Sequence, residues 1–270
     1  MEPVTVLMRD SAHVATLPGR SGWRVVKRPD TDLIEDALNI LVLVAASDLS
    51  AVADFVREAN RTHHLRALLV HADVDAVWVV QMLDRADLRT LRNLLVHEGP
   101  AVPRRVFGAW KLGAQRQLVA DARVVGNRLM AVSCAMERVE VAFKDVPALA
   151  RLPVEERAQF EIADDGSYLH WPGSDVHLDL DALRVVVDPK AREAARVERI
   201  RHDERFGRAV ARVREKAGLR QEDVPGVSAR QVRRIEGGAL PRSATLEKLA
   251  EAHGMGMKGY LDRVALELSE

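Results

Sequence analysis

The sequence has little of several features that would identify a common class of protein. It contains a single cysteine, Cys134, in 270 residues, so it can form no intramolecular disulfide, and we expect a reducing compartment. Its longest apolar run, residues 40–46, is far too short to cross a bilayer. The N-terminal MEPVTVLMRD lacks the apolar core of a secretory signal. We therefore expect a cytoplasmic protein with no membrane partner.

Motifs of common phosphate-binding and nucleophilic sites are also missing. The chain contains no P-loop and no GxSxG motif, whose glycines would cradle a phosphate or expose a nucleophilic serine. Four histidines invite a metal hypothesis, but none is paired at the His-x-x-x-His spacing: His63, His64, His71 and His97. We interpret them as structural residues and expect a protein that is not an enzyme and uses no metal or cofactor.

The chain also has no net charge, with 40 basic and 40 acidic residues, which argues against a protein that is basic throughout. The charges are nevertheless unevenly distributed. Residues 190–242 contain 15 Lys and Arg against 8 Asp and Glu, a net charge of +7, so the rest of the chain carries −7. A basic C-terminal segment on an acidic body is typical of nucleic-acid binding. The alternative is that these charges are solvated faces of charged helices.

Residues 1–122 have the pattern of an α/β domain. Apolar runs rich in Val, Leu and Ile predict buried strands, and polar caps between them predict helices, so we expect a partly parallel sheet. The expected elements are an edge strand at 4–8, strands at 37–46 and 65–72, helices starting at Ser47 and at a cap on Asp73, an ambiguous segment at 91–99, and a helix over 103–120.

Two aspartates of this domain fall where buried strands would end. Asp48 and Asp73 follow the runs 37–46 and 65–72, and α/β folds place ligands at that edge of the sheet. Both residues also stand where helix caps are expected. We favour the capping interpretation, and an effector pocket or an enzyme active site is the alternative.

Residues 123–189 have the pattern of a small β-rich domain. Strands are expected on both sides of a turn at Gly126–Asn127, and a second strand pair, with Trp171 packed at its edge, precedes a short helix. The segment FEI…GSYLHWPGSDVHLD resembles a small bacterial family of uncharacterised function whose members often precede a repressor-type helix-turn-helix. A hard-metal site is one interpretation of the polar side chains here, but we favour strand-face acids and helix caps: Asp175, His177, Asp179 and Asp181.

Residues 218–237, GLRQEDVPGVSARQVRRIEG, predict short helices around a turn. A glycine closes a first helix, Gln221 opens a short second one, and Pro225–Gly226 interrupts it. Ser228 is placed to cap a third helix, 229–236, because its hydroxyl can accept a bond from an unpaired N–H of the first turn. Within that helix two apolar residues can face a core while the arginines point elsewhere, which suits insertion into a DNA major groove.

Residues 206–267 resemble the Cro/repressor-type (Xre-type) helix-turn-helix family. The interval from Gln221 to Ser228 is shorter than the usual spacing of that family, so the second helix must be short or the turn unusual. The resemblance rests on the first helix FGRAVARVREKAG, Gln221, Val227-Ser228, the ending Ile235-Glu236-x-Gly238, and a fourth helix with Leu246, Leu249 and Ala250. A fourth helix capped by Ser243 and a fifth from Met257 to Leu268 would complete the domain.

The resemblance implies roles for individual residues. Base-reading positions fall on Ala229, Arg230 and Arg234, and we expect Arg230 to be the main base reader because arginine bonds guanine in two places. Positions that usually contact phosphate fall on Ser228 and Gln221. The nine expected DNA-contacting residues, some of them positioning residues on phosphate, are Arg220, Gln221, Ser228, Ala229, Arg230, Gln231, Arg233, Arg234 and Arg242. Glu236 is expected to tie the end of its helix to neighbouring residues.

Together these patterns predict an α+β multidomain protein with an α/β domain at 1–122, a β-rich α+β domain at 123–189, a charged helical linker or dimer seam at 190–205, and an all-α, five-helix helix-turn-helix domain at 206–270. We expect a homodimeric repressor of transcription that binds double-stranded DNA, with its N-terminal domains serving dimerisation, a partner protein or a small-molecule effector. The alternatives are an antitoxin-like or defence-system autoregulator and an α/β enzyme with a DNA-targeting module.

Overall fold

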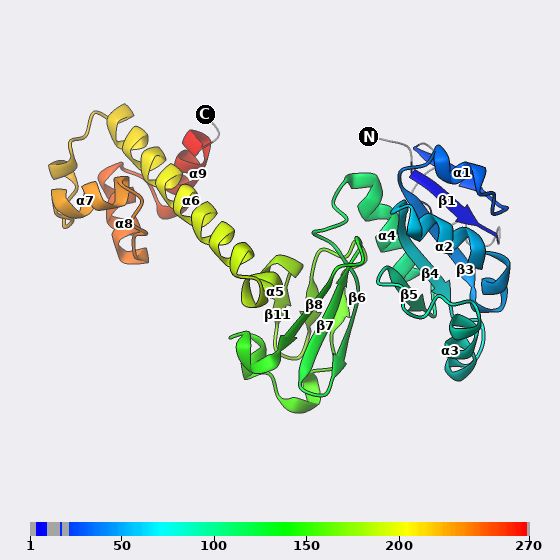
Figure 1. The fold of residues 1–270 in the computed structure, drawn as a ribbon. Helices are drawn as coiled ribbons and strands as arrows, with labels where there is room; N and C mark the ends of the chain where they lie inside the picture. Colours follow the sequence, from blue (N-terminus) through cyan, green and yellow to red (C-terminus); the bar gives the residue numbers. More distant parts are fainter. Residues whose placement is uncertain (1–3, 10–16, 18–21, 269–270) are drawn as a thin grey trace. The chain divides into compact units, whose positions relative to one another are not determined.

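The computed structural model describes residues 4–9, 17 and 22–268. The protein is a mixed α/β chain that ends in a helical region (Figure 1). Its contacts divide it into two compact units, Met1–Asp188 and Pro189–Glu270. Within the described ranges, no helix combines the length and the apolar character that a membrane span requires.

The first unit is built on a five-stranded sheet with the order β2-β1-β3-β4-β5, in which every neighbouring pair is parallel. The strands are β1 (Val4–Met8), β2 (Trp23–Val26), β3 (Ile40–Ala45), β4 (Leu65–His71) and β5 (Leu94–His97). The prediction that 4–8 is an edge strand was wrong, because the short strand β2 pairs with its outer side.

Both faces of this sheet are covered, which explains why its central strand β3 is apolar throughout. Helix α2 (Ala53–Arg61) packs on one face through Phe55 and Val56, and α4 (Ala101–Leu112) packs on the other through Val106 and Phe107 (Figure 1). The short helix α1 (Asp32–Glu35) and helix α3 (Ala76–Arg85) contribute buried residues to the same core as α2.

Three local predictions in this region need correction. The cap of α3 is Asp75, whose carboxylate accepts a bond from Val77 N at 2.9 Å, rather than Asp73. The segment after Ser47 first forms a 3₁₀ turn, η2 (Ala46–Ala51), before α2 begins. The helix expected over 103–120 ends at Leu112, because Gly113 adopts the left-handed conformation (φ 70°) that stops a helix.

Two small antiparallel sheets complete the first unit. They are β6 (Val119–Val125), β7 (Arg128–Ser133) and β8 (Arg138–Ala142) in one, and β9 (Glu161–Ile162), β10 (Leu169–Trp171) and β11 (Val176–Leu178) in the other. The turn at Gly126–Asn127 is confirmed. Trp171 lies on the central strand β10 and not at a sheet edge as expected. It is fully buried and donates its indole N–H to Arg157 O at 3.1 Å, so it packs rather than presents a ligand platform. Helix α5 (Leu180–Val187) follows.

The expected division at residue 122 falls inside strand β6. Cys134 and Met136, from the turn between β7 and β8, join the core on the α4 face of the parallel sheet. Trp110 of α4 donates its indole N–H to the backbone carbonyl of Cys134 at 3.1 Å. The parallel sheet and the first antiparallel sheet, β6 to β8, therefore share buried apolar surface.

The second unit is entirely helical. The bounds expected for α7 (Ala229–Glu236) and α9 (Met257–Leu268) are confirmed. The segment 190–205, expected to be a connector, is continuous with the helix expected from 206, and together they form the 28-residue helix α6 (Pro189–Lys216). The second of the five expected helices is a three-residue 3₁₀ turn, η6 (Gln221–Asp223). Helix α8 is Ser243–Ala252, and its N-cap is Arg242 rather than Ser243.

Helices α6 and α7 cross with their backbones in contact. A Cβ atom on Gly207 of α6 would lie 2.5 Å from the carbonyl oxygen of Ile235 and 2.6 Å from that of Glu236. Just past the end of α7, Gly238 has φ +98°, and a Cβ there would lie 3.1 Å from Glu204 N. Two glycines therefore permit a helix crossing that no larger residue would allow.

Replacing Gly207 with alanine is expected to lower the free energy of unfolding of the second unit by about 1–3 kcal/mol, because the added methyl group meets backbone that cannot move aside freely. The matched control is Gly259→Ala in α9, where no described atom lies within 4 Å of the added carbon. Since alanine favours a helix, the control is expected to be neutral or stabilising. Urea denaturation followed by far-UV circular dichroism measures both, and equal losses in the two variants would contradict the crossing.

Candidate nucleic-acid interface

Helix α7 has one apolar and one basic face. Val232 and Ile235 are buried, whereas the three arginines of the helix, Arg230, Arg233 and Arg234, are all exposed. Ser228 caps the helix as predicted, because its hydroxyl accepts a bond from Gln231 N at 3.3 Å. The spacing of the two apolar residues therefore packs one side of α7 into the core and leaves its guanidinium groups in solvent.

The apolar side of α7 rests in a core that the other helices of the unit supply. This core contains Val210 and Val213 of α6, Leu249 of α8, and Tyr260 and Val264 of α9. Burial raises the pKa of Tyr260 to about 12, so its phenol stays neutral inside the core. As expected from the sequence, the flanking helices cover the back of α7, and they hold its exposed side in a fixed orientation.

The single acid of α7, Glu236, is occupied by two neighbours. Its carboxylate accepts bonds from Arg214 Nε at 2.5 Å and Nη2 at 3.3 Å, and from the side-chain amide of Gln221 at 2.5 Å. The Arg214 and Glu236 side chains are each only 10% exposed. The hydrogen bond to Glu236 raises the pKa of Arg214 although burial opposes it. Glu236 therefore ties the end of α7 to α6 and leaves the arginines of α7 unneutralised.

Three of the expected contact residues are exposed and unengaged. Within the part of the chain that the structure describes, the side chains of Arg230, Arg234 and Arg242 form no hydrogen bond and no ion pair. Arg230 and Arg234 are four residues apart on α7, and this spacing places them on the same helix face. Their ten N–H groups are free for acceptors outside the chain.

The remaining expected contact residues have partners or are partly covered. Arg220 is paired with Glu222 at 2.7 Å and with Asp223 at 3.1 Å, and the hydrogen bond that it donates to Asp223 raises the pKa of Arg220. Arg233 Nε lies 3.4 Å from Gln221 Oε1, and Gln231 Nε2 lies 3.4 Å from Thr245 Oγ1. Ala229 is half-buried. These residues hold the turn and both ends of the helix together, a role that the sequence pattern alone did not reveal.

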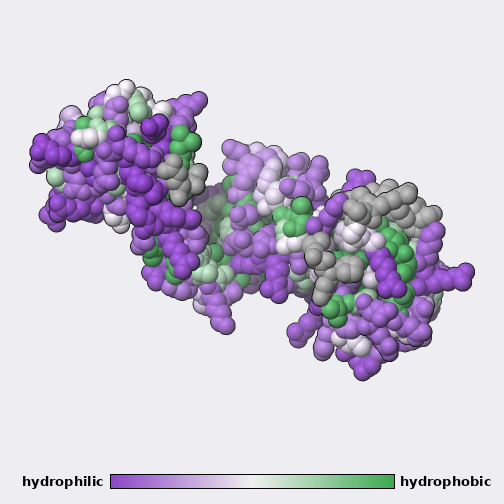
Figure 2. Space-filling view, turned by 90° about the horizontal axis from the view of Figure 1, so that it is seen from above, coloured by the Kyte–Doolittle hydropathy of each residue, from purple (hydrophilic) through white to green (hydrophobic). Residues whose placement is uncertain are grey.

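The surface of the helical unit is mainly hydrophilic in the view of Figure 2, where the unit lies at the left. The apolar side chains of α7, Val232 and Ile235, are buried and do not contribute to this surface. Such a surface suits a charged ligand better than an apolar one.

A pocket of about 420 Å³ lies at the carboxyl edge of the parallel sheet. Ser47 donates its backbone N–H, at 3.1 Å, and its hydroxyl to the Asp73 carboxylate. Although partial burial opposes it, this bonding lowers the pKa of Asp73. Arg9 lies 3.9 Å from Asp48 across the same pocket. Asp48 and Asp73 thus do meet at the edge where α/β folds bind ligands, but neither caps the helix expected to follow it.

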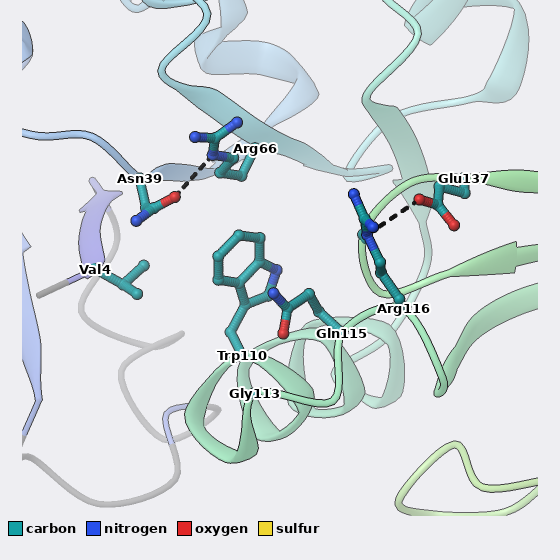
Figure 3. Close-up of a pocket in the computed structure, with 9 residues that line it drawn as sticks. Val4, Asn39, Arg66, Trp110, Gly113, Gln115, Arg116 and Glu137 are labelled. Atoms are coloured by element: carbon teal, nitrogen blue, oxygen red, sulfur yellow. Dashed lines mark hydrogen bonds and ion pairs between the residues drawn. The ribbon is translucent and has the colours of Figure 1, made fainter. Parts of the chain in front are cut away.

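Figure 3 shows a second pocket, of about 480 Å³, at the opposite edge of the sheet. Its walls include Arg66, whose Nε donates to Asn39 Oδ1 at 2.8 Å, and Arg116, whose Nε lies 3.4 Å from Glu137 Oε1. The indole of Trp110 stands between them (Figure 3). Because both arginines already have partners and parallel sheets bind ligands at the other edge, this pocket is the weaker candidate.

Two further sequence features have structural explanations. The described part of the chain does not bring His63, His64, His71 and His97 into a group with metal-ligand spacing; His64 Nδ1 lies 2.9 Å from Ile34 O, and His97 Nδ1 lies 2.9 Å from Gly99 O. A GxGxxG sequence at 254–259 joins α8 to α9. A dinucleotide-binding loop follows a strand, so this context excludes that interpretation.

Comparison with known proteins adds one match. A family described as "Protein of unknown function (DUF2442)" matches residues 135–185, which lie within the segment 123–189. No curated protein and no solved structure shows significant similarity to the chain. The match covers strands β8 to β11 and most of α5, and it assigns no function.

A double-mutant cycle tests the link between α6 and α7. Arg214→Ala and Glu236→Ala are each expected to destabilise the second unit by about 3–5 kcal/mol, because each leaves a buried charge without its partner. The double variant is expected to lose less than the sum of the two. Glu193→Ala, which breaks an exposed pair with Arg196 on α6, serves as the control and should change stability little. Additive losses in the double variant would show that the two side chains act independently.

Proposed function

We propose that the protein is a transcriptional regulator of the Xre type that binds double-stranded DNA in a sequence-specific manner, with residues 206–270 as its helix-turn-helix domain. One observation carries the proposal. Helix α7 exposes three guanidinium groups while its only acid is turned inward onto Arg214. A short helix with a buried apolar side and an unneutralised basic side suits the phosphates and base edges of a major groove.

We assign base contacts to Arg230 and Arg234, which share one face of α7 and have no partner within the described ranges. Arginine bonds guanine O6 and N7 in a bidentate manner. Arg230 lies near the start of α7, where recognition helices contact base edges, and Arg234 lies one turn later on the same face. Arg242 and Arg233 are assigned to phosphate, which positions the protein without reading sequence. Arg220 is the weaker phosphate candidate because DNA has to compete with two carboxylates.

The other four expected contact residues are assigned mainly positioning roles. Gln221 bonds Glu236, and Ser228 caps α7. Gln231 contacts Thr245 of α8, and Ala229 lies partly covered at the start of the helix. Their backbone N–H groups and side chains can still meet phosphate at the rim of the interface.

We propose that the regulator works as a homodimer, because an eight-residue helix contacts too few base pairs for a specific site and dimers bind two half-sites. The first unit offers a surface for this. Val77, Trp78 and Val80 of α3 are exposed by 64%, 52% and 42%, an apolar group that a second copy would remove from water. We propose a repressor that acts in the cytoplasm and has no enzymatic activity.

A second candidate function is regulation through a ligand or partner bound by the first unit. The pocket at the carboxyl edge of the sheet, with Arg9, Asp48 and the Ser47–Asp73 pair, fits a small polar effector. A partner protein, as in an antitoxin-like autoregulator, would instead cover the apolar group on α3. An enzyme would need turnover at the same pocket.

Substitutions on α7 test DNA binding directly. Arg230→Ala and Arg234→Ala are each expected to weaken specific binding by about 1–3 kcal/mol and to relax the preference at one base pair. Arg242→Ala is expected to weaken binding to all duplexes and to reduce the salt slope by about one. Fluorescence anisotropy with the DNA upstream of the gene, and with random duplex, over a range of KCl concentrations measures all three.

The matched control is Arg263→Ala, since Arg263 is also exposed and unpaired within the described ranges but lies on α9. It is expected to bind like the wild type. If Arg230→Ala and Arg234→Ala also keep wild-type affinity and base preference, α7 is not the DNA-reading helix. If no variant and no wild-type protein prefers the upstream DNA over random duplex, the proposed function itself fails.

Association is tested by sedimentation of the full chain. The wild type is expected to be a dimer, and Trp78→Glu is expected to produce monomers that bind the upstream DNA more weakly, because a carboxylate would have to be buried at the interface. Val154→Glu is the control, since Val154 is a 73% exposed apolar residue outside α3. A dimer that persists in Trp78→Glu would place the dimer interface elsewhere. A monomeric wild type would favour a partner protein on this surface.

A further inference from the structure

The outer face of the second antiparallel sheet carries a row of metal-ligating side chains. His170 of β10 lies directly opposite His177 of β11 and, on its other side, opposite Glu161 of β9. Side chains at directly opposed positions point to the same face of a sheet. The two imidazole rings are stacked, with centroids 4.0 Å apart and planes inclined by 14°. Asp175, in the loop before β11, brings a carboxylate oxygen within 3.8 Å of His177 Nδ1.

We propose that His170, His177 and Asp175 bind a divalent transition-metal ion of the Zn²⁺ type. The ligand atoms that these three side chains offer all lie within 4.8 Å of one another. Zinc is held by imidazole nitrogen and carboxylate oxygen at about 2.0–2.2 Å, so small rotations of the half-buried His170 and of the exposed Asp175 and His177 suffice to enclose an ion. A water molecule would complete a four-coordinate site.

The hairpin is anchored in a way that holds these ligands in place. Inward-facing Leu169 and Trp171 flank His170 and are fully buried, which fixes the outward direction of His170. In the loop, Ser174 Oγ donates to Glu156 Oε2 at 2.6 Å, directly before Asp175. The ring of Tyr168 meets the His177 ring edge-on at 5.2 Å. A supported and oriented ligand set binds metal more tightly than a mobile one.

The acids nearest in sequence are committed elsewhere. Asp179 caps α5 by accepting a bond from Ala182 N at 2.7 Å, and Asp181 pairs with Arg184 at 2.9 Å. Asp179 and Asp181 are therefore not available as ligands of the hard-metal site considered from the sequence. The ligand set proposed here keeps Asp175 and His177 and adds His170. Two imidazoles favour Zn²⁺, Ni²⁺ or Cu²⁺ over Ca²⁺ or Mg²⁺, which prefer oxygen ligands.

The experiment uses full-length, untagged, metal-free protein titrated near neutral pH with ZnCl₂ by isothermal titration calorimetry, and with CoCl₂ by visible absorption. The wild type is expected to bind one ion per chain and to show the absorption band of four-coordinate Co²⁺. His170→Gln and His177→Gln are each expected to weaken Zn²⁺ binding by roughly tenfold or more, and Asp175→Asn by less. Zinc should raise the Tm of the wild type but not of the histidine variants.

His202→Gln is the matched control, because His202 is an exposed histidine on α6, and it should bind Zn²⁺ like the wild type. Circular dichroism and Tm without metal check that each variant keeps its fold, which matters most for His170 because it is half-buried. The proposal is overturned if the wild type binds no Zn²⁺ in excess metal, if both histidine variants bind it as the wild type does, or if CaCl₂ competes equally with ZnCl₂. None of these outcomes depends on DNA binding.

Discussion

The basic surface of α7 depends on the contact between Arg214 and Glu236. A buried ion pair is costly to form, because both charges lose water, and it is tolerated only where further hydrogen bonds satisfy the remaining groups. Here they do: Arg214 also donates to Leu219 O at 2.7 Å, and Glu236 also accepts from Gln221. One pair therefore connects α6, the turn after it, η6 and the end of α7. It also turns the single acid of α7 away from solvent.

The backbone contact at Gly207 works together with this pair. An eight-residue helix such as α7 is unstable in isolation, because helix nucleation is unfavourable and few residues follow the nucleus. Its order has to come from what it packs against. The glycine lets α6 approach closely, the ion pair sets the direction of approach, and the apolar core of α8 and α9 closes the remaining side. The arginines can be exposed because other residues supply the stability.

Local chemistry made much of the second unit predictable. The Ser228 cap, the apolar spacing of Val232 and Ile235, and the glycines after Glu236 all act within a few residues, so the bounds of α7 followed from the sequence. The same holds for the turn at Gly126–Asn127. Features that depend on distant partners were not predictable. Strand β2 has a half-exposed pattern and forms an edge only because β1 pairs with it, and Arg214 meets Glu236 across 22 residues.

The pairing of His170 with His177 shows why the candidate metal site was only partly predictable from the sequence. Sequence proximity grouped Asp175 and His177 with two later acids, but the first of these caps a helix and the second pairs with an arginine. His170 is seven positions before His177, and only the register of β10 on β11 places the two side chains opposite each other.

The sequence also failed to predict that α6 continues through residue 205. Its exposed first half has no marked apolar stripe, so nothing in the local pattern joined it to the second half.

Burial of the only cysteine in the core beneath α4 has a consequence for chemical reactivity. Burial raises the pKa of the Cys134 thiol to about 12, although Arg105 opposes the shift, and the side chain is fully enclosed. A thiol reacts with alkylating reagents as its thiolate and only where the reagent can reach it. Modification therefore requires this core to open, and the labelling rate at equilibrium reports the opening free energy of the first unit. The second unit contributes no thiol, so the signal comes from the first unit alone.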